Sequence, residues 1–264
     1  MNFGLLIIGD EILSGKRADK HLPKVIELLA ARGLALAWAH YVGDEPARIT
    51  AELRAAFASG DIVFSCGGIG ATPDDHTRRC AADALGRPLA LHPQARELIM
   101  ERVRKMAAEH GWSADPQHPD TLRRLEMGVF PEGAAIIENP FNKIPGFSID
   151  DVHFVPGFPV MAHPMIESLL DTRYAHLQRR DQWRERSVIV MGSMEATLTP
   201  LMEQIESHHP GVKVFSLPSV DHPQYGRHIE LGVKGHPEQV EAAYPKLLAG
   251  LAAQAVRLGP ELVR

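Results

Sequence analysis

The run Cys66–Thr77 (CGGIGATPDDHT) places three glycines and a pair of adjacent acids in one short segment. The glycines allow tight turns that bring backbone N–H groups close to a ligand, and the helix expected after them adds its partial positive charge. A phosphate group suits such a loop. Asp74 and Asp75 would repel this anion, whereas a divalent cation between carboxylate and phosphate removes the repulsion. The run therefore predicts a site for a phosphate and a divalent metal.

The same acids also have a structural explanation. With Thr72 as the N-cap and Pro73 as the first helical residue, Asp75 falls at the third helical position, where a capping box would stabilise the helix by about 1 kcal/mol. A capping box uses one acid, whereas Asp74 and Asp75 both stand at the helix start. The run has neither the Gly-Lys-Ser/Thr of a P-loop nor the GxGxxG of dinucleotide-binding folds.

A second acidic motif, Gly9–Gly15 (GDEILSG), directly follows the apolar run Phe3–Ile8. We expect Phe3–Ile8 and Asp61–Cys66 to be the first and third strands of a parallel sheet. Ligands bind outside the carboxyl ends of such strands, so Asp10 and Glu11 should face the same crevice as the glycine-rich run. The alternative is that both are solvated loop acids.

Basic residues near both motifs are candidate phosphate contacts. Arg78 and Arg79 lie one turn into the expected third helix, where they could reach a phosphate as bidentate donors or lie on an exposed helix face. Lys16 and Arg17 follow the first motif and could bind phosphate in the same way. Cys66, by contrast, is more typical of a buried core thiol than of a nucleophile.

Strand-like and helix-like segments alternate through the first part of the chain, which indicates βαβ units around a parallel sheet. The expected strands are Phe3–Ile8, Leu34–Val42, Asp61–Cys66 and Ala134–Ile137, with a hairpin formed by Phe147–Ile149 and Val152–Val155. The expected helices are His21–Arg32, Pro46–Ser59, Pro73 to about Leu85, Pro93 to about His110, and a helix near His163–Leu170, with a turn at Asp115–Asp120.

A charged segment separates these elements from a smaller domain. We predict a first domain over residues 1–172, a charged linker over 173–186 and a small domain over 187–264. In the small domain we expect the strands Ser187–Met191, Val212–Leu217 and His228–Val233 and the helices Glu195–His208 and Pro237–Arg257. The resulting β-α-β-β-α order is typical of a small α+β domain.

Composition excludes several classes of protein. The chain has 264 residues, 45% of them hydrophobic and 23% charged, which is typical of a globular protein. With a net charge of −5, the chain lacks the cationic surface that non-specific nucleic-acid binding needs. No apolar run approaches the roughly 20 residues of a membrane-spanning helix, and two cysteines without a CxxC pair fit a reducing cytoplasm. We predict a soluble, cytoplasmic protein without nucleic-acid or membrane partners.

Four motifs together resemble a known family. They are Gly9–Gly15, Val42–Asp44 (VGD), Gly67–Thr77 (GGIGATPDDHT) and Pro156–Pro159 (PGFP). Over roughly residues 3–170 the chain resembles the MoaB/Mog molybdopterin-binding domain, in the form found at the amino terminus of competence-damage-inducible protein A (CinA). The small domain is similar to the KH-like middle domain of that family.

The resemblance implies a three-layer α/β/α fold around a mostly parallel sheet, followed by a KH-like α+β domain. It implies that Asp10, Asp74 and Asp75 are catalytic acids that hold a divalent metal such as Mg²⁺. The expected phosphate-binding and ligand-binding residues are Gly9, Glu11, Ser14, Gly67, Gly68, Gly70, Thr72, Thr77, Arg78, Asn139, Pro156 and Gly157.

Relatives are associated with two chemistries, and both act on a phosphoanhydride. Metal-dependent hydrolysis of ADP-ribose-like or FAD-like pyrophosphates is the leading expectation. Adenylylation of molybdopterin in molybdenum cofactor biosynthesis is the alternative, and a non-catalytic ligand-binding or dimerising protein is a third. The expected partner is a small-molecule phosphoanhydride or pterin, molybdopterin included, and we expect a homo-oligomer.

Some positions depart from the family pattern. Asp19–His21 (DKH) stands where relatives commonly have Asp-Thr-Asn, which exchanges an amide for an imidazole and adds a cation beside the expected base or pterin pocket. In the loop Asn139–Gly146, Asn142 replaces a glycine and Ile144 an alanine. Asn tolerates the left-handed conformation, so we expect the turn to persist. Longer CinA proteins have a further, carboxy-terminal deamidase domain, whereas this sequence ends at Arg264. We therefore expect no nicotinamide-nucleotide deamidase activity.

Overall fold

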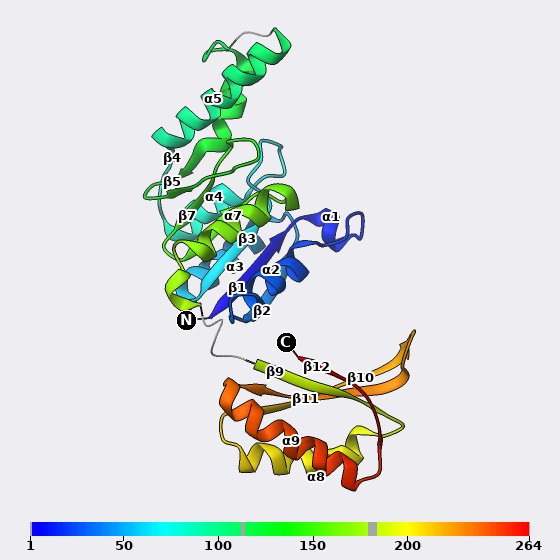
Figure 1. Ribbon diagram of the computed structural model, residues 1–264. Coiled ribbons are helices and arrows are strands. Elements are labelled where there is room, and N and C mark those ends of the chain that lie inside the picture. The colour runs from blue at the N-terminus through cyan, green and yellow to red at the C-terminus, as the bar shows by residue number, and fades with distance from the viewer. Residues whose placement is uncertain (1, 112–113, 179–183, 264) are drawn as a thin grey trace. The chain divides into compact units, whose positions relative to one another are not determined.

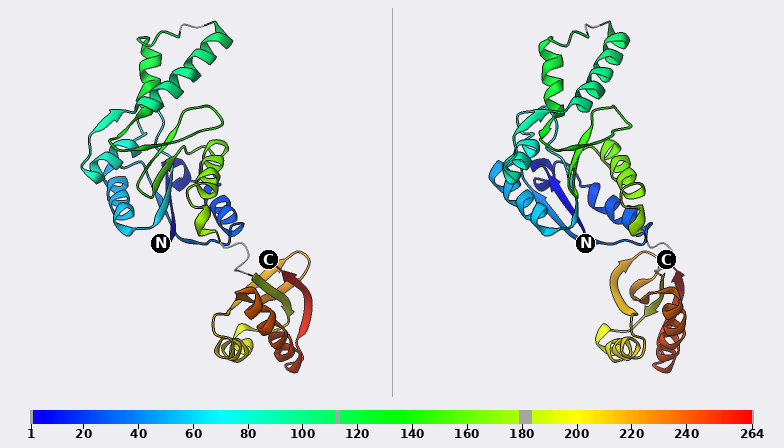
Figure 2. Two further views of the ribbon diagram at one scale, coloured as in Figure 1. Left: turned by 60° about the vertical axis from the view of Figure 1, so that its left-hand side comes forward. Right: turned by 90° about the vertical axis from the view of Figure 1, so that its left-hand side faces the viewer.

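The computed structural model describes residues 2–111, 114–178 and 184–263. It divides the chain into two compact units, Met1–Gln178 and Arg179–Arg264 (Figures 1 and 2). The division falls inside the segment 173–186 that we expected as a linker, of which residues 179–183 lie outside the described residues. Among the described helices, none has the length and apolar character to cross a membrane.

A six-stranded sheet in the order β2-β1-β3-β8-β7-β6 is the centre of the first unit. Its strands are β1 (Phe3–Ile8), β2 (Leu36–Val42), β3 (Ile62–Cys66), β6 (Ala135–Ile137), β7 (Gly146–Ile149) and β8 (Val152–Val155). β2, β1, β3 and β8 run parallel to one another, and β7 and β6 complete the sheet with antiparallel pairings. The sheet is therefore mostly parallel, as expected.

Helices cover both faces of this sheet. The helices are α2 (His21–Ala30) and α7 (Pro159–Asp171) on one face, and α3 (Pro46–Ser59) and α4 (Thr77–Leu85) on the other (Figure 1). All of β1 is buried because its alternate side chains enter both layers: Phe3, Leu5 and Ile7 pack with α2 and α7, while Leu6 and Ile8 pack with α3. The three-layer α/β/α prediction is confirmed.

Successive strands are added to the sheet on opposite sides of β1. From β1 the chain passes through α2 to β2 on one side, and from β2 through α3 to β3 on the other. The loops after β1 and β3 consequently diverge and leave a crevice outside their carboxyl ends, which is where open α/β sheets bind ligands.

A helical extension interrupts the alternation after α4. It is built from β4 (Leu89–Leu91), α5 (Pro93–His110), α6 (Pro119–Leu125), the short 3-10 helix η1 (Glu126–Gly128) and β5 (Val129–Pro131). β4 pairs with β5, and a small apolar cluster joins α5 to α6. The turn predicted over Asp115–Asp120 is wrong in part, because α6 begins at Pro119 with His118 as its N-cap.

The second unit is a separate antiparallel sheet in the order β10-β11-β9-β12. Its elements are β9 (Arg184–Met191), α8 (Glu195–His208), β10 (Lys213–His222), β11 (Gly226–Gly235), α9 (Pro237–Ala253) and β12 (Arg257–Val263). The two helices share one apolar core with the sheet. The helix predicted to run to Arg257 instead ends at Ala253, and the residues from Arg257 form a fourth strand beside β9.

Candidate functional site

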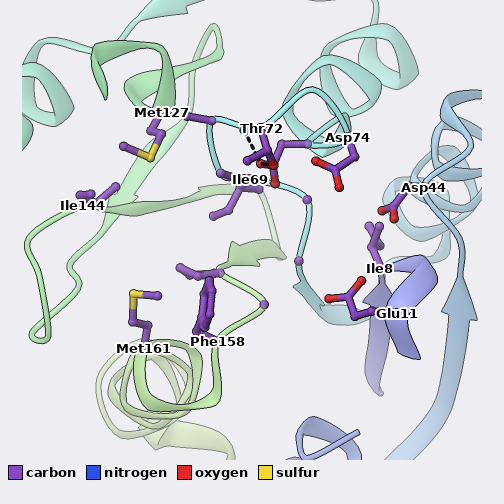
Figure 3. Close-up of a pocket in the computed structure, with 18 of the residues that line it drawn as sticks. Ile8, Glu11, Asp44, Ile69, Thr72, Asp74, Met127, Ile144, Phe158 and Met161 are labelled. Atoms are coloured by element: carbon purple, nitrogen blue, oxygen red, sulfur yellow. Dashed lines mark hydrogen bonds between the residues drawn. The ribbon is translucent and has the colours of Figure 1, made fainter. Parts of the chain in front are cut away.

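A cavity of about 420 Å³ lies at the carboxyl ends of the parallel strands (Figure 3). β1, β3 and β8 each lead into a segment that lines it, and the loop after β2 adds one residue. The lining consists of Ile8, Gly9, Glu11, Arg17, Asp44, Gly67, Gly68, Ile69, Gly70, Ala71, Thr72, Asp74, Asp75, Met127, Asn139, Asn142, Ile144, Pro145, Pro156, Gly157, Phe158 and Met161. The crevice predicted from strand order is therefore a real cavity.

The motif after β1 forms the short helix α1 (Asp10–Leu13). Asp10 and Asp44 are joined by two reciprocal hydrogen bonds: the Asp10 N–H donates to Asp44 Oδ2 (2.9 Å) and the Asp44 N–H donates to Asp10 Oδ1 (3.2 Å). Asp10 does not line the cavity, whereas Gly9 and Glu11 do. Asp10 thus ties the loops after β1 and β2 together, and Ser14 lies outside the lining.

Asp44 is the acid that sequence reasoning left out of the site. Its carboxylate faces the cavity with those of Glu11 and Asp74 (Figure 3). Burial and the neighbouring charges of Asp10, Glu11 and Asp74 raise the pKa of Asp44, against a hydrogen bond from the Asp10 N–H that lowers it. The VGD motif after β2 was the available signal.

Asp75 organises the glycine-rich loop from within. It accepts hydrogen bonds from Gly70 N (2.8 Å), Thr72 N (2.8 Å) and the Thr72 hydroxyl (2.5 Å). α4 begins only at Thr77, with His76 at the N-cap position. The capping box from Thr72, which was the structural alternative for these acids, is therefore wrong: Asp75 closes the loop before the helix, and Thr72 donates to it.

This arrangement changes which loop donors can reach a phosphate. Gly67 N–H donates to Val155 O (3.0 Å), and Asp75 occupies the N–H groups of Gly70 and Thr72. Within the described loop Gly67–Thr77, the N–H groups of Gly68, Ile69 and Ala71 have no hydrogen-bond partner, and the N–H of Asp74 acts on its own carboxylate. These three are the donors that the loop leaves for an anion.

Thr77 and Arg78 bind backbone oxygens of the glycine-rich loop and do not line the cavity. The Thr77 hydroxyl donates to Gly67 O (3.1 Å), and its N–H donates to Gly68 O (3.0 Å). Gly68 has φ +70°, and a Cβ there would collide with the Thr77 hydroxyl, so only glycine fits. The Arg78 guanidinium donates to Ile69 O, and burial lowers the pKa of Arg78. Both residues position the loop.

Asn139 stabilises the loop opposite the glycines. Its buried side chain accepts from Phe141 N and donates to Asn142 Oδ1 and Ile144 O. The left-handed residue of this loop is Lys143 (φ 68°), so our assignment of that conformation to Asn142 is wrong. Asn142 instead accepts from Ile144 N (3.0 Å), which fixes the loop through its side chain.

One wall of the cavity is apolar and is formed by Ile69, Met127, Ile144, Phe158 and Met161. Figure 3 shows this wall on the side away from the carboxylates of Glu11, Asp44 and Asp74. Thioether and aromatic groups adapt to flat rings, so this wall suits a heterocycle while the opposite wall is acidic.

The three acids predicted to hold a metal do not converge on one point. Asp10 is bonded to the Asp44 backbone and Asp75 to its own loop, while Asp74 is exposed and interacts with the Thr72 side chain. Among the described residues, no three His, Cys, Asp or Glu side chains are arranged to bind a metal ion. The set therefore does not fit a resident metal centre.

Comparison with known proteins gives the family. A family model described as a probable molybdopterin binding domain matches residues 4–176. A CinA-like protein of Syntrophotalea carbinolica is 28% identical over 217 residues, which is 78% of this chain and 50% of that protein. A CinA-like protein of Mycobacterium tuberculosis is 27% identical over 79% of this chain and 50% of its own length. The chain thus spans about half the length of these relatives.

Two further comparisons give a relative that matches nearly the whole chain and a solved structure with a similar fold. A protein of Pyrobaculum calidifontis is 28% identical over 94% of this chain and 93% of its own length. The crystal structure of CinA, of unknown function, from Thermoplasma acidophilum is 25% identical, covers 65% of this chain and 98% of that one, and has a TM-score of 0.53. Because the family model matches residues 4–176, which is more than half of the chain and includes every residue that lines the cavity, the chain belongs to the family of probable molybdopterin binding domains.

Proposed function

We propose that the cavity binds a small molecule in which a flat ring is joined to a pyrophosphate, and that the protein hydrolyses this phosphoanhydride. The carrying observation is that one cavity has an apolar wall, an acidic wall and a glycine-rich loop between them. The ring would pack on Phe158 and Met161, and the free N–H groups of Gly68, Ile69 and Ala71 would bind the phosphates.

The acidic wall sets a condition on that ligand. Glu11, Asp44 and Asp74 would repel a bare pyrophosphate. Mg²⁺ commonly uses one or two carboxylates together with substrate phosphates, so an ion that enters with the ligand needs no resident centre. When bound, such an ion neutralises the phosphates and favours attack by water. The acids of this wall would position that complex, with Asp44 and Asp74 in place of the predicted trio.

The test is release of AMP from ADP-ribose or FAD in the presence of Mg²⁺, Mn²⁺ or Co²⁺. Asp44→Asn and Asp74→Asn should each remove most of the turnover. Asp83→Asn is the matched control, because Asp83 is an exposed acid on α4 that pairs with Arg79 and lies outside the cavity lining. Absence of turnover with all three metals would refute hydrolysis.

A second candidate follows from the family match. A molybdopterin-type pterin is also a flat ring system that carries a phosphate, and its adenylylation would use the same two walls. Incubation with ATP and the pterin should then transfer AMP to the pterin phosphate and release pyrophosphate. This product, without AMP release from ADP-ribose, would favour this activity over hydrolysis.

A further inference from the structure

A second cavity of about 300 Å³ adjoins the first. The two share Ile8, Glu11, Arg17 and Gly157, so one ligand can extend from the first into the second. The remaining lining is Ile7, Ile12, Ala18, Lys20, His21, Cys66 and Pro159. Burial raises the pKa of Cys66, which excludes a reactive thiolate as the purpose of this cavity.

The charge of the second cavity is opposite to that of the first. Arg17 and Lys20 line it with a single acid, Glu11, whereas four carboxylates line the first cavity. Neither cation forms an ion pair with another described residue, and the Arg17 guanidinium lies over the Phe158 ring at 5.9 Å. Asp19 lies outside the lining, where its carboxylate accepts from His21 N, Leu22 N and the Tyr41 hydroxyl.

His21 adds a buried polar atom without a partner. The ring is 4% exposed, and its Nε2 lies 3.0 Å from Gly157 O. A carbonyl oxygen only accepts, so Nε2 carries the proton and donates. Nδ1 is then a lone-pair acceptor in the neutral ring, and it is buried with no hydrogen-bond partner in the described structure. Such an atom calls for a donor from the ligand.

We propose that the second cavity is a phosphate subsite, which holds a terminal phosphate monoester of the ligand bound in the first cavity. Arg17 and Lys20 supply positive charge for the oxyanion. A phosphate monoester has a second pKa of about 6, so close to that pH much of it is the monoanion, whose O–H can donate to His21 Nδ1. Sulfate and carboxylate have no such donor at that pH. The assignment rests on the proposed function and makes the substrate a pyrophosphate with an additional phosphate.

The experiment is calorimetric titration of the full chain with inorganic phosphate and with sulfate. Phosphate should bind more tightly than sulfate. Lys20→Met should weaken phosphate binding by about fivefold, the value of an exposed charge contact, and Lys20→Arg should restore it. Lys16→Met is the matched control, because Lys16 lies in the same loop but lines neither cavity. Its affinity for phosphate should equal that of the wild type.

Three results would overturn the subsite: no phosphate binding, equal affinity for sulfate, or the same affinity in Lys20→Met as in Lys16→Met. Each is distinguishable from failure of the proposed function. If ADP-ribose is bound or hydrolysed while Lys20→Met leaves the affinity for phosphate unchanged, the subsite is wrong and the function stands. If phosphate binding depends on Lys20 while no pyrophosphate is bound, the subsite stands and the function is wrong.

Discussion

Asp74 and Asp75 are neighbours in the chain, but their carboxylates have different surroundings. Asp75 accepts three hydrogen bonds from the glycine-rich loop, whereas Asp74 is exposed at the acidic wall of the cavity. The first carboxylate stabilises the loop in the absence of ligand. The second is available to a ligand or to a cation that accompanies it, and the two roles can be separated by mutation.

Asp75→Asn should lower the free energy of unfolding by about 1–2 kcal/mol, because an amide cannot accept from all three donors and turns its own N–H₂ towards one of them. Asp74→Asn should leave the unfolding free energy unchanged and weaken only ligand binding. Chemical denaturation of both variants beside the wild type measures this difference. Equal destabilisation by the two substitutions would contradict these roles.

Among the elements, those with local signals were predictable and those that depend on distant partners were not. Phe3–Ile8 and Pro46–Ser59 match because a fully apolar run and a proline at a helix start are local features. α4 begins at Thr77 rather than Pro73 because the Asp75 side chain closes the loop ahead of it. β12 was not predicted, and only its first residue, Arg257, fell in the expected helix, because the pairing of β12 with β9 joins residues far apart in sequence.

The candidate site divides in the same way. The glycines and acids after β1 and β3 could be found from residue type and strand order. Asp44 had a signal in the VGD motif but was not assigned to the site. The apolar wall could not be assigned, because Met127, Ile144 and Met161 come from three separate segments and carry no motif. Tertiary packing alone brings them to one cavity.

A hydrogen-bond chain joins β7, β8 and the segment that follows α7. Tyr174 donates its hydroxyl proton to Asp151 (2.7 Å), so His153 Nε2–H donates to the Tyr174 oxygen (2.6 Å) and Nδ1 accepts from Ser148 (2.7 Å). Burial, and to a lesser degree the charge of Arg173, lower the pKa of His153 to about 3. The imidazole is therefore neutral in the folded protein.

His153→Gln should reduce the acid sensitivity of the fold. The histidine takes up a proton at its ordinary pKa of 6.5 in the unfolded chain and only at a pKa of about 3 in the folded chain. Its contribution to the free energy of unfolding is therefore fully present above pH 6.5 and is lost as the pH falls towards 3. Stability measured across that range should fall less steeply in the variant than in the wild type. Parallel curves would show that His153 contributes nothing to the pH dependence.

At the scale of the whole molecule, each of the two units has its own apolar core. Every residue that lines either cavity lies between Ile7 and Met161, inside the first unit. Tyr174, which is buried in the core of that unit, lies beyond residue 172, where the sequence predicted the first domain to end. The core therefore requires a few residues of the segment that we expected to be a linker.

A fragment of residues 1–178 should unfold cooperatively and bind ligand with the Kd of the full chain. A fragment of residues 1–172 should be less stable, because it lacks Tyr174 and leaves His153 without a partner at Nε2. Thermal unfolding and calorimetric titration of both fragments measure this. Failure of residues 1–178 to bind a ligand that the full chain binds would show that the second unit contributes to the site.

The central claim is that the acidic wall admits a pyrophosphate ligand only with a divalent cation, and one titration tests it. α,β-Methylene ADP-ribose, which resists hydrolysis, is titrated into the wild type and Asp44→Asn with and without Mg²⁺. We predict that omission of Mg²⁺ weakens wild-type binding by about tenfold or more and weakens the variant far less, because one repelling charge is gone. No binding, or equal affinity with and without Mg²⁺ in the wild type, would contradict the account.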